Sequence, residues 1–294
     1  MNTDLSPDYY RDESTEATIQ KTKDCIEYVR QIDPKHELVT PIITPRFAPS
    51  CTRDCLEELG KLHKETGYPA QTHLSENTSE VKLVRELFPE CESYTHVYDD
   101  TGLLTEKMVL AHCVHLSNKE IDLVKQRDAK ISHCPASNTA LTSGCAKIRK
   151  YLDTGITVGL GTDVSGGFSP SILETARQAI WVSRFVAMLD GDHAKLSTEE
   201  VLYLATRGGA AVVGLSDKIG GFEVGKEWDA QMIKLDEVPV HSEGASEHDG
   251  PVDIFGWESW ENKVNKWVYN GNDKNTLAVW VKGRLVHSTW AYKP

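Results

Sequence analysis

Two spacings of apolar residues alternate along the chain. Short apolar runs that end in polar groups are each followed by a segment whose apolar residues recur every three or four positions. The first spacing is typical of buried strands, and the second is typical of amphipathic helices. The expected strands are, in chain order, residues 39–47, 69–73, 108–112, 129–134 and 156–163.

The segments between these runs predict the helices. They are expected at residues 14–33, from 52 or 54 to about 67, at 80–87 with Asn77 or Thr78 as the N-cap, at 118–127, through Ile148 and Leu152, and at 169–189. Residues 136–144 (ASNTALTSG) are expected to form a loop. Strands that alternate with helices predict right-handed βαβ units and therefore a parallel sheet.

The chain changes character after Leu189. One more helix is expected at 198–215, followed later by a linker rich in Glu, Ser and His around 241–250. The last segment alternates like a strand that contains a turn at Lys282-Gly283. We therefore expect two parts: residues 1–215 form the part in which strands alternate with helices, and residues 216–294 form a small β structure packed beside it.

Each expected strand ends in a polar side chain. In chain order these are Arg46, His73, His112, His133 with Cys134, and Asp163. Because (β/α) barrels build their sites at the carboxyl ends of parallel strands, this pattern predicts one site at that edge of the sheet. A doubly wound sheet is the alternative, but no glycine fingerprint for a dinucleotide follows the first strand.

His73 and Glu76 bring an imidazole and a carboxylate to the same strand end. An imidazole suits a metal ion, and a carboxylate suits proton transfer. The structural alternative is a buried His73 with Glu76 capping the following helix. His112 could instead be a hydrogen-bonded histidine at a strand end without a catalytic role. Asp163 could cap the helix at 169–189. Arg46 could form an ion pair with an acidic residue in the core.

Three further polar residues are assigned supporting roles. His133 and Asn138 are expected either to be structural or to support the residues that reach the site, with Asn138 bonding the backbone of its own loop. His115 is expected to be a surface or capping residue.

Composition places the chain among globular proteins. Its 294 residues, 39% of them hydrophobic, suffice for one large domain or two small ones. A net charge of −12 repels phosphate backbones and argues against a nucleic-acid partner. No apolar run approaches the roughly 18 residues of a membrane span. The odd number of cysteines, 7, and the polar, acidic start predict reduced thiols in the cytoplasm.

A series of motifs connects the chain with a known family. They are ITPRF, HLSEN, AHC, HCPASN, GLGTDVSGG, LATRGGAAVVGL and IGGFEVGKEWDA, and they run nearly from end to end. In this order they resemble the amidohydrolase superfamily and, within it, the guanine deaminases. HLSEN and GTD are superfamily-level signals, whereas Arg46-Phe47 together with HCPASN and GTDVSGG favours the guanine deaminases. The resemblance implies a TIM-like (β/α) barrel.

The resemblance also implies a role for each site residue. His73 and Asp163 would be zinc ligands, Glu76 would move the proton, and His112 would lie beside the reacting water. The catalytic set is then Glu76, His112 and Asp163. Zinc makes a bound water acidic enough to react near neutral pH, and a carboxylate suits general acid–base work.

The substrate implied by the resemblance is guanine, which water would convert to xanthine and ammonia. Arg46 and Phe47 would hold the purine, with Arg46 donating hydrogen bonds to its O6 carbonyl. The metal-side residues His73, Glu76 and Asp163 would line the same pocket. The resemblance implies a homodimer for the full-length form.

One departure from the family pattern concerns the metal. The superfamily carries a His-x-His pair on its first barrel strand, and no two histidines here lie two residues apart. By resemblance the chain starts inside the barrel, just before the fourth strand. We therefore expect an incomplete barrel, and a chain that binds zinc weakly and lacks deaminase activity when isolated.

Two other interpretations stay open at this point. One is a catalytically inactive scaffold or regulatory relative that has lost the metal. The other is an amidohydrolase that acts on another purine or on a triazine-like ring, since these share HLSE and GTD. The presence of His73, Glu76, His112 and Asp163 together favours an enzyme.

Overall fold

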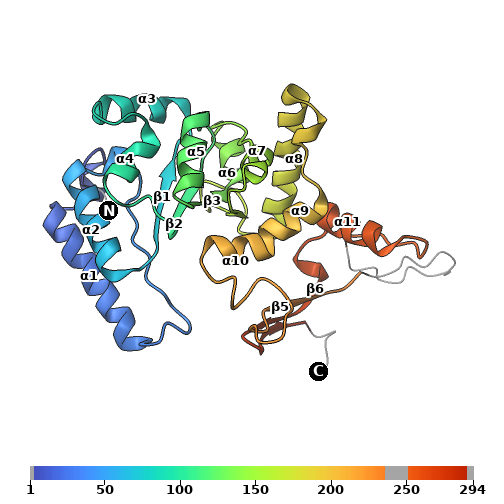
Figure 1. The fold of residues 1–294 in the computed structure, drawn as a ribbon. Helices are drawn as coiled ribbons and strands as arrows, with labels where there is room; N and C mark the ends of the chain where they lie inside the picture. The colour runs from blue at the N-terminus through green and yellow to red at the C-terminus, as the bar shows by residue number, and fades with distance from the viewer. Residues whose placement is uncertain (1–2, 236–250, 290–294) are drawn as a thin grey trace.

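A computed structural model describes residues 3–235 and 251–289 of the chain (Figure 1). Its central element is a sheet of four parallel strands in the order β1-β2-β3-β4. The bounds of these strands are β1 Ala70–Leu74, β2 Met108–His112, β3 Lys130–His133 and β4 Val158–Leu160. The α/β class and the parallel sheet predicted from the sequence are confirmed.

The register of the sheet brings the strand ends to one edge. Leu74 lies opposite His112, Ala111 opposite Ser132, and His133 opposite Leu160. The polar residues predicted at the strand ends therefore lie side by side at this edge of the sheet, as the sequence pattern predicted.

The expected strand at 39–47 is wrong in extent. Ile43 makes a single parallel bridge to Ala70, although the segment does run beside β1. The Ile43 amide donates to Pro69, and the Arg46 carbonyl accepts from the His73 amide. Pro41 and Pro45 lack the N–H donors that a continuous ladder needs, which explains why the pairing stays incomplete.

Helices flank the sheet and continue beyond it (Figure 1). Their bounds are α1 Thr15–Ile32, α2 Arg53–Thr66, α3 Thr78–Leu87, α4 Tyr94–Asp100, α5 Asn118–Gln126, α6 Pro135–Ala140, α7 Ile148–Asp153, α8 Ile172–Asp190, α9 Thr198–Tyr203, α10 Gly209–Val212 and α11 Trp260–Asn270.

The expected helix starts agree with the caps in the structure. The Thr52 hydroxyl caps α2 and Gly67 ends it with φ +68°. Asn77 caps α3 in a capping box with Glu80, which satisfies two backbone donors at the start of the helix. The cap fixes where α3 begins after β1, and hence the position of Glu76 in the turn between them.

Two sequence expectations for helices need correction. Residues 136–144 are not wholly a loop, because α6 begins at Pro135, whose fixed φ suits the first helical position. The single helix expected at 198–215 is instead α9, a π-helical segment Leu204–Gly208 (η4), and α10. Gly208 packs closely against the sheet: a Cβ there would lie 2.5 Å from the Val158 carbonyl oxygen.

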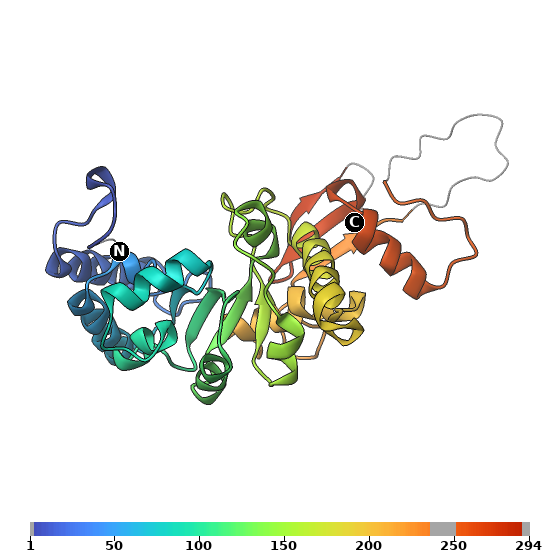
Figure 2. The same cartoon turned by 90° about the horizontal axis from the view of Figure 1, so that it is seen from above.

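The C-terminal part forms a second sheet. Strands β5 Ala230–Ile233, β6 Thr276–Val281 and β7 Arg284–Ser288 pair antiparallel, and the turn at Lys282-Gly283 is confirmed. Viewed from above, this sheet and α11 lie at the opposite end of the molecule from α1 and α2 (Figure 2). The expected linker at 241–250 lies outside the described residues. The division at residue 215 stays a proposal.

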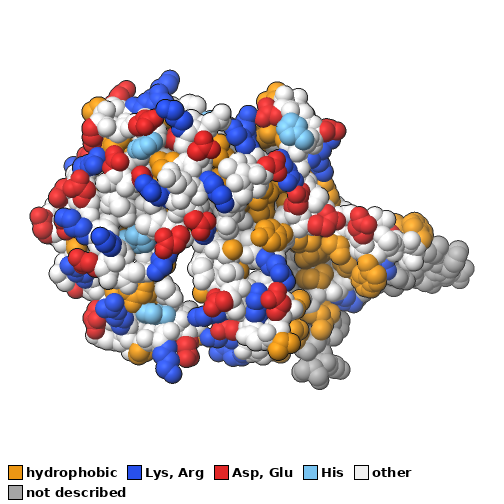
Figure 3. All heavy atoms as spheres, viewed as in Figure 1, with side chains coloured by type: hydrophobic (Ala, Val, Ile, Leu, Met, Phe, Trp, Pro, Cys, Tyr) orange, Lys and Arg blue, Asp and Glu red, His pale blue; other side chains and the backbone are white. Residues whose placement is uncertain are grey.

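The main core lies around the parallel sheet rather than the second sheet. Leu56, Leu110 and Ile131 are fully buried in it, whereas every residue of β7 is exposed. Figure 3 displays hydrophobic side chains on the face that carries α10 and the second sheet. Phe222 and Trp228, whose rings contact each other, are both exposed. In the described residues, the second sheet therefore adds little to the core.

The described residues bear on two expectations from the sequence, which concern membrane spans and disulfides. None of their helices combines the length and hydrophobicity that a membrane span requires. No disulfide joins the seven cysteines, all of which lie in the described ranges, and Cys51 and Cys55 are buried.

The hydroxyl of Tyr98 ties the end of β1 to the chain beside it. It is fully buried and donates to the His73 carbonyl at 2.9 Å, while accepting from the Ala48 amide at 2.9 Å and from the Thr72 hydroxyl at 3.0 Å. Three segments that approach the site therefore depend on one oxygen atom.

Replacing Tyr98 by Phe is expected to destabilise the protein by about 1–3 kcal/mol, because the buried Ala48 amide loses its acceptor. Chemical denaturation followed by circular dichroism measures the change. Tyr28→Phe, on the exposed face of α1, is the matched control and should leave the free energy of unfolding unchanged. Equal stabilities for the two variants would contradict this account of Tyr98.

Candidate active site

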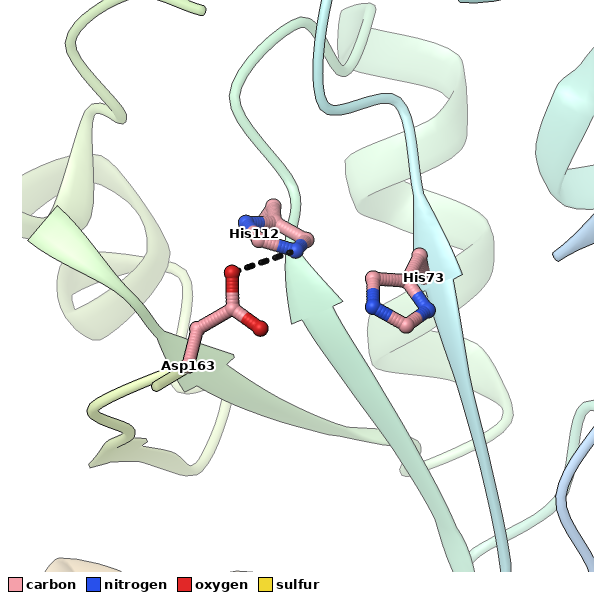
Figure 4. A group of neighbouring side chains, drawn as sticks. All are labelled: His73, His112 and Asp163. Carbon is pink, nitrogen blue, oxygen red and sulfur yellow. Dashed lines mark ion pairs between the residues drawn. The ribbon is translucent and has the colours of Figure 1, made fainter. Parts of the chain in front are cut away.

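His73, His112 and Asp163 converge at the carboxyl edge of the parallel sheet (Figure 4). His73 and His112 come from the ends of β1 and β2, and Asp163 follows β4. One potential ligand atom from each lies within 4.8 Å of the others. The structure thus brings together three of the polar strand exits that the sequence singled out.

Both imidazoles are held by their Nδ1 atoms. His73 Nδ1 lies 2.6 Å from the Arg46 carbonyl oxygen, and His112 Nδ1 lies 2.8 Å from Oδ1 of Asn138. Each Nδ1 therefore donates, which leaves the Nε2 of a neutral ring with its lone pair. His112 Nε2 is buried and has no hydrogen-bond partner among the described residues. Two such imidazoles and a carboxylate form a donor set that suits a divalent transition metal.

Glu76 borders the same cluster. Its Oε2 lies 3.8 Å from His112 Nε2, and Asp163 Oδ2 lies at the same distance from that nitrogen. The Ser143 hydroxyl donates to Glu76 Oε1 at 2.9 Å. Glu76 is not the helix cap, since Asn77 and Glu80 fill that role.

Asp163 likewise does not cap the following helix, whose N-cap is Ser171. The adjoining glycine explains how the carboxylate is accommodated. A Cβ at Gly166 would lie 2.8 Å from Asp163 Oδ2, so a larger residue would displace the carboxylate.

Arg46 and Phe47 lie beside the cluster, on the segment that follows the Ile43 bridge. The Arg46 guanidinium carbon is 5.2 Å from the centre of the Phe47 ring and 5.9 Å from that of Tyr10. The Phe47 and His73 rings meet edge to face, with centroids 6.5 Å apart. Arg46 is exposed and stacked on aromatic rings, as suits a group that meets a planar ligand.

His133 and Cys134, the polar residues at the end of β3, are buried and lie outside the cluster of potential metal ligands. Neither ring nitrogen of His133 has a partner among the described residues. Burial, with a smaller effect of His112, lowers the pKa of His133 to about 3, so the ring stays neutral. Burial and the nearby Asp163 raise the pKa of Cys134 to about 12, so its thiol stays protonated.

The backbone takes unusual conformations around the cluster. Ser75, His112, Cys113 and Asp163 all have positive φ, between +46° and +70°. Non-glycine residues adopt such angles rarely, and they concentrate at functional sites. The sharp turns after three strands therefore point to a site that requires these geometries.

Comparison with known proteins identifies the family. The profile of the amidohydrolase family matches residues 2–286. The chain belongs to the amidohydrolase family.

This amidohydrolase is similar to proteins named as guanine deaminases. It is 50% identical over 283 residues to a probable guanine deaminase of Schizosaccharomyces pombe, covering 96% of this chain and 52% of the relative. It is 44% identical over 281 residues to the guanine deaminase of Dictyostelium discoideum, covering 96% and 60% respectively. The chain thus spans little more than half of these relatives.

A solved structure agrees with both the sequence similarity and the fold. The crystal structure of guanine deaminase from C. acetobutylicum with bound guanine superposes with a TM-score of 0.83 at 33% identity, covering 97% of this chain and 64% of that one. The amidohydrolase-type (β/α) fold predicted from the sequence is confirmed.

Several residues at the site escaped the sequence reasoning. Asn138 has the supporting role expected of it, but its side chain orients His112 instead of bonding its own loop. Ser143 was treated only as part of a loop. His115 was expected on the surface, yet its Nε2 donates to the Ser143 carbonyl at 2.7 Å. Tyr10 carried no signal, because its contact with Arg46 joins distant parts of the chain.

If the cluster binds a divalent metal, His73→Ala and Asp163→Ala should each lower zinc affinity by more than about 100-fold. Losing a direct ligand should cost at least as much as losing the outer hydrogen bonds that orient one. Competition with a chromogenic chelator measures the affinity. His287→Ala, exposed on β7, is the control, and affinities equal to that control in both variants would exclude these residues as ligands.

Proposed function

We propose that the protein hydrolyses guanine to xanthine and ammonia in a zinc-dependent reaction. The observation that carries this proposal is the meeting of His73, His112 and Asp163 with Glu76, beside Arg46 and Phe47. Similarity to guanine deaminases over 96% of the chain supports the choice of substrate. Because the chain spans only part of the length of those relatives, the activity of the whole protein is itself proposed.

His73 and Asp163 would hold the zinc ion, with His112 beside them. When bound, zinc supplies Lewis acidity that makes a water molecule reactive near neutral pH. The fit rests on the Nε2 lone pair that the Nδ1 hydrogen bond leaves available on His73, and on the carboxylate of Asp163 beside it. The carboxylate of Asp163 would also accept a hydrogen bond from the water and orient it.

Glu76 would act as the general base and general acid. Its carboxylate takes a proton from the attacking water and delivers it to N3 of guanine, and a further proton transfer lets the C2 amine leave as ammonia. The overall reaction consumes one water molecule and changes no oxidation state. His112, whose Nε2 faces both carboxylates, would stabilise the charge that develops on oxygen when Nε2 carries a proton.

Arg46 and Phe47 would hold the purine. The guanidinium presents planar donors that match the O6 carbonyl, and the Phe47 ring offers an apolar face next to His73. Because O6 and the C2 amine lie on different edges of guanine, a contact at O6 can turn the amine towards Glu76.

The alternatives are less well supported. A scaffold protein gains nothing from burying the Nε2 of His112 without a partner, since such an atom costs stability. Hydrolysis of a triazine-like ring rests on solved structures that are only 22% identical to this chain. We further propose a cytoplasmic location, which the absence of disulfides among the cysteines supports, and a homodimeric full-length form.

The proposal predicts zinc-dependent release of ammonia from guanine but not from adenine. Adenine lacks the O6 acceptor for Arg46 and carries its amine at C6, away from the reacting water. A coupled ammonia assay on the purified full-length form, with and without added zinc, measures both rates. Arg46→Lys, which keeps the charge but loses the planar pair of donors, should raise KM for guanine. Equal turnover of the two purines would contradict the assignment of substrate.

A further inference from the structure

A closed set of hydrogen bonds surrounds the side chain of Glu76. It joins the turn after β1, the turn after β2 and the loop after α6. We propose that Ser143, supported by His115, is a positioning residue that fixes the Glu76 carboxylate in the orientation needed for proton transfer. This inference rests on the proposed function, because it concerns the orientation of Glu76, the residue proposed to transfer the proton.

Ser143 distinguishes the two carboxylate oxygens of Glu76. Its hydroxyl donates to Oε1 at 2.9 Å, while Oε2 faces His112 Nε2 at 3.8 Å. One oxygen is thereby occupied by a fixed donor, and the other is turned towards the metal cluster. Ser143 is buried, at 8% exposure, so water competes poorly for its hydroxyl. A carboxylate held by one oxygen cannot rotate freely, and the oxygen that carries the proton stays aimed at the site.

His115 fixes Ser143 in turn. Its Nε2 donates to the Ser143 carbonyl oxygen at 2.7 Å. The backbone amides of Val114 and His115 both donate to the Ser75 carbonyl oxygen at 3.1 Å. Since Ser75 precedes Glu76 directly, these hydrogen bonds lead from the Glu76 side chain back to the backbone of the neighbouring residue.

The loop that carries Ser143 is anchored at a second point. The Ser143 amide donates to the Asn138 carbonyl at 2.8 Å, and the Asn138 side chain orients His112. The same short segment therefore sets the positions of both Glu76 and His112. Displacing it would alter the distance between the proton carrier and the imidazole that faces it.

Gly144 allows this close approach. Its φ of +135° suits glycine, and a Cβ there would lie 3.3 Å from the His115 ring and 3.0 Å from the Val114 side chain. A larger residue would push His115 away from the Ser143 carbonyl. The backbone next to Ser143 is thus adapted to the contact with His115.

The experiment compares Ser143→Ala, Ser143→Thr and the control Ser79→Ala, which alters an exposed serine on α3. Positioning predicts that Ser143→Ala lowers kcat for guanine by about 10- to 100-fold with KM and zinc content nearly unchanged. Ser143→Thr, which keeps the hydroxyl, should recover most of the rate, and Ser79→Ala should match the unsubstituted protein. His115→Phe should lower kcat by a smaller factor.

A double-mutant cycle separates positioning from a general loss of structure. Glu76→Gln alone should lower kcat by about 10²–10⁴-fold, and adding Ser143→Ala to it should cost little more, because the proton carrier is already absent. If the two losses in kcat multiply in the double variant, or if Ser143→Ala leaves kcat unchanged, Ser143 does not position Glu76. If His115→Phe leaves kcat unchanged, His115 does not support Ser143.

The proposed function can fail separately. If the unsubstituted full-length form releases no ammonia from guanine, that function is wrong. Thermal unfolding then tests whether Ser143 holds Glu76. Ser143→Ala should lower Tm in the unsubstituted protein but much less in a Glu76→Ala background. Equal decreases in both backgrounds would mean that Ser143 does not hold Glu76.

Discussion

The site depends on one constraint, the register of four parallel strands. Because β1, β2, β3 and β4 point the same way and are matched in register, the residues that follow them meet at one edge. His73 and His112 emerge from neighbouring strands with their rings stacked 5.2 Å apart, and Asp163 approaches them from the far strand. Tyr98, Asn138 and Ser143 then fix backbone, imidazole and carboxylate by hydrogen bonds. A register shift of one residue in β1 or β2 would turn the His73 or His112 side chain to the opposite face of the sheet.

Much of this arrangement was predictable from periodicity alone. β2 lies where the apolar run MVLAH placed it, and the capping box of Asn77 and Glu80 fixed the start of α3. Strand ends in (β/α) folds concentrate chemistry, so His73, His112 and Asp163 could be selected without a structure. The strand at 39–47 was overestimated because its prolines, although apolar, cannot complete a ladder.

What the sequence did not reveal arises from tertiary contacts. The residues of α4, YTHVYDD, favour helix weakly, and the burial of Tyr94, Val97 and Tyr98 stabilises the helix instead. The roles of Asn138, Ser143 and His115 require side chains to meet across turns whose positive φ angles no pattern announces. By contrast, α11 carries a cap at Ser259 and apolar residues at helical spacing, so its signal was present and overlooked.

The central claim is that imidazole and carboxylate groups of the strand ends hold a zinc ion. X-ray absorption at the zinc edge, on the protein loaded with one equivalent, tests this directly. The account predicts nitrogen and oxygen neighbours at about 2.0–2.1 Å with the outer-shell scattering of imidazole, lost together when His73 and Asp163 are replaced by Ala. Sulfur neighbours at about 2.3 Å would mean that buried thiols such as Cys113 or Cys134 bind the metal, and would contradict the account.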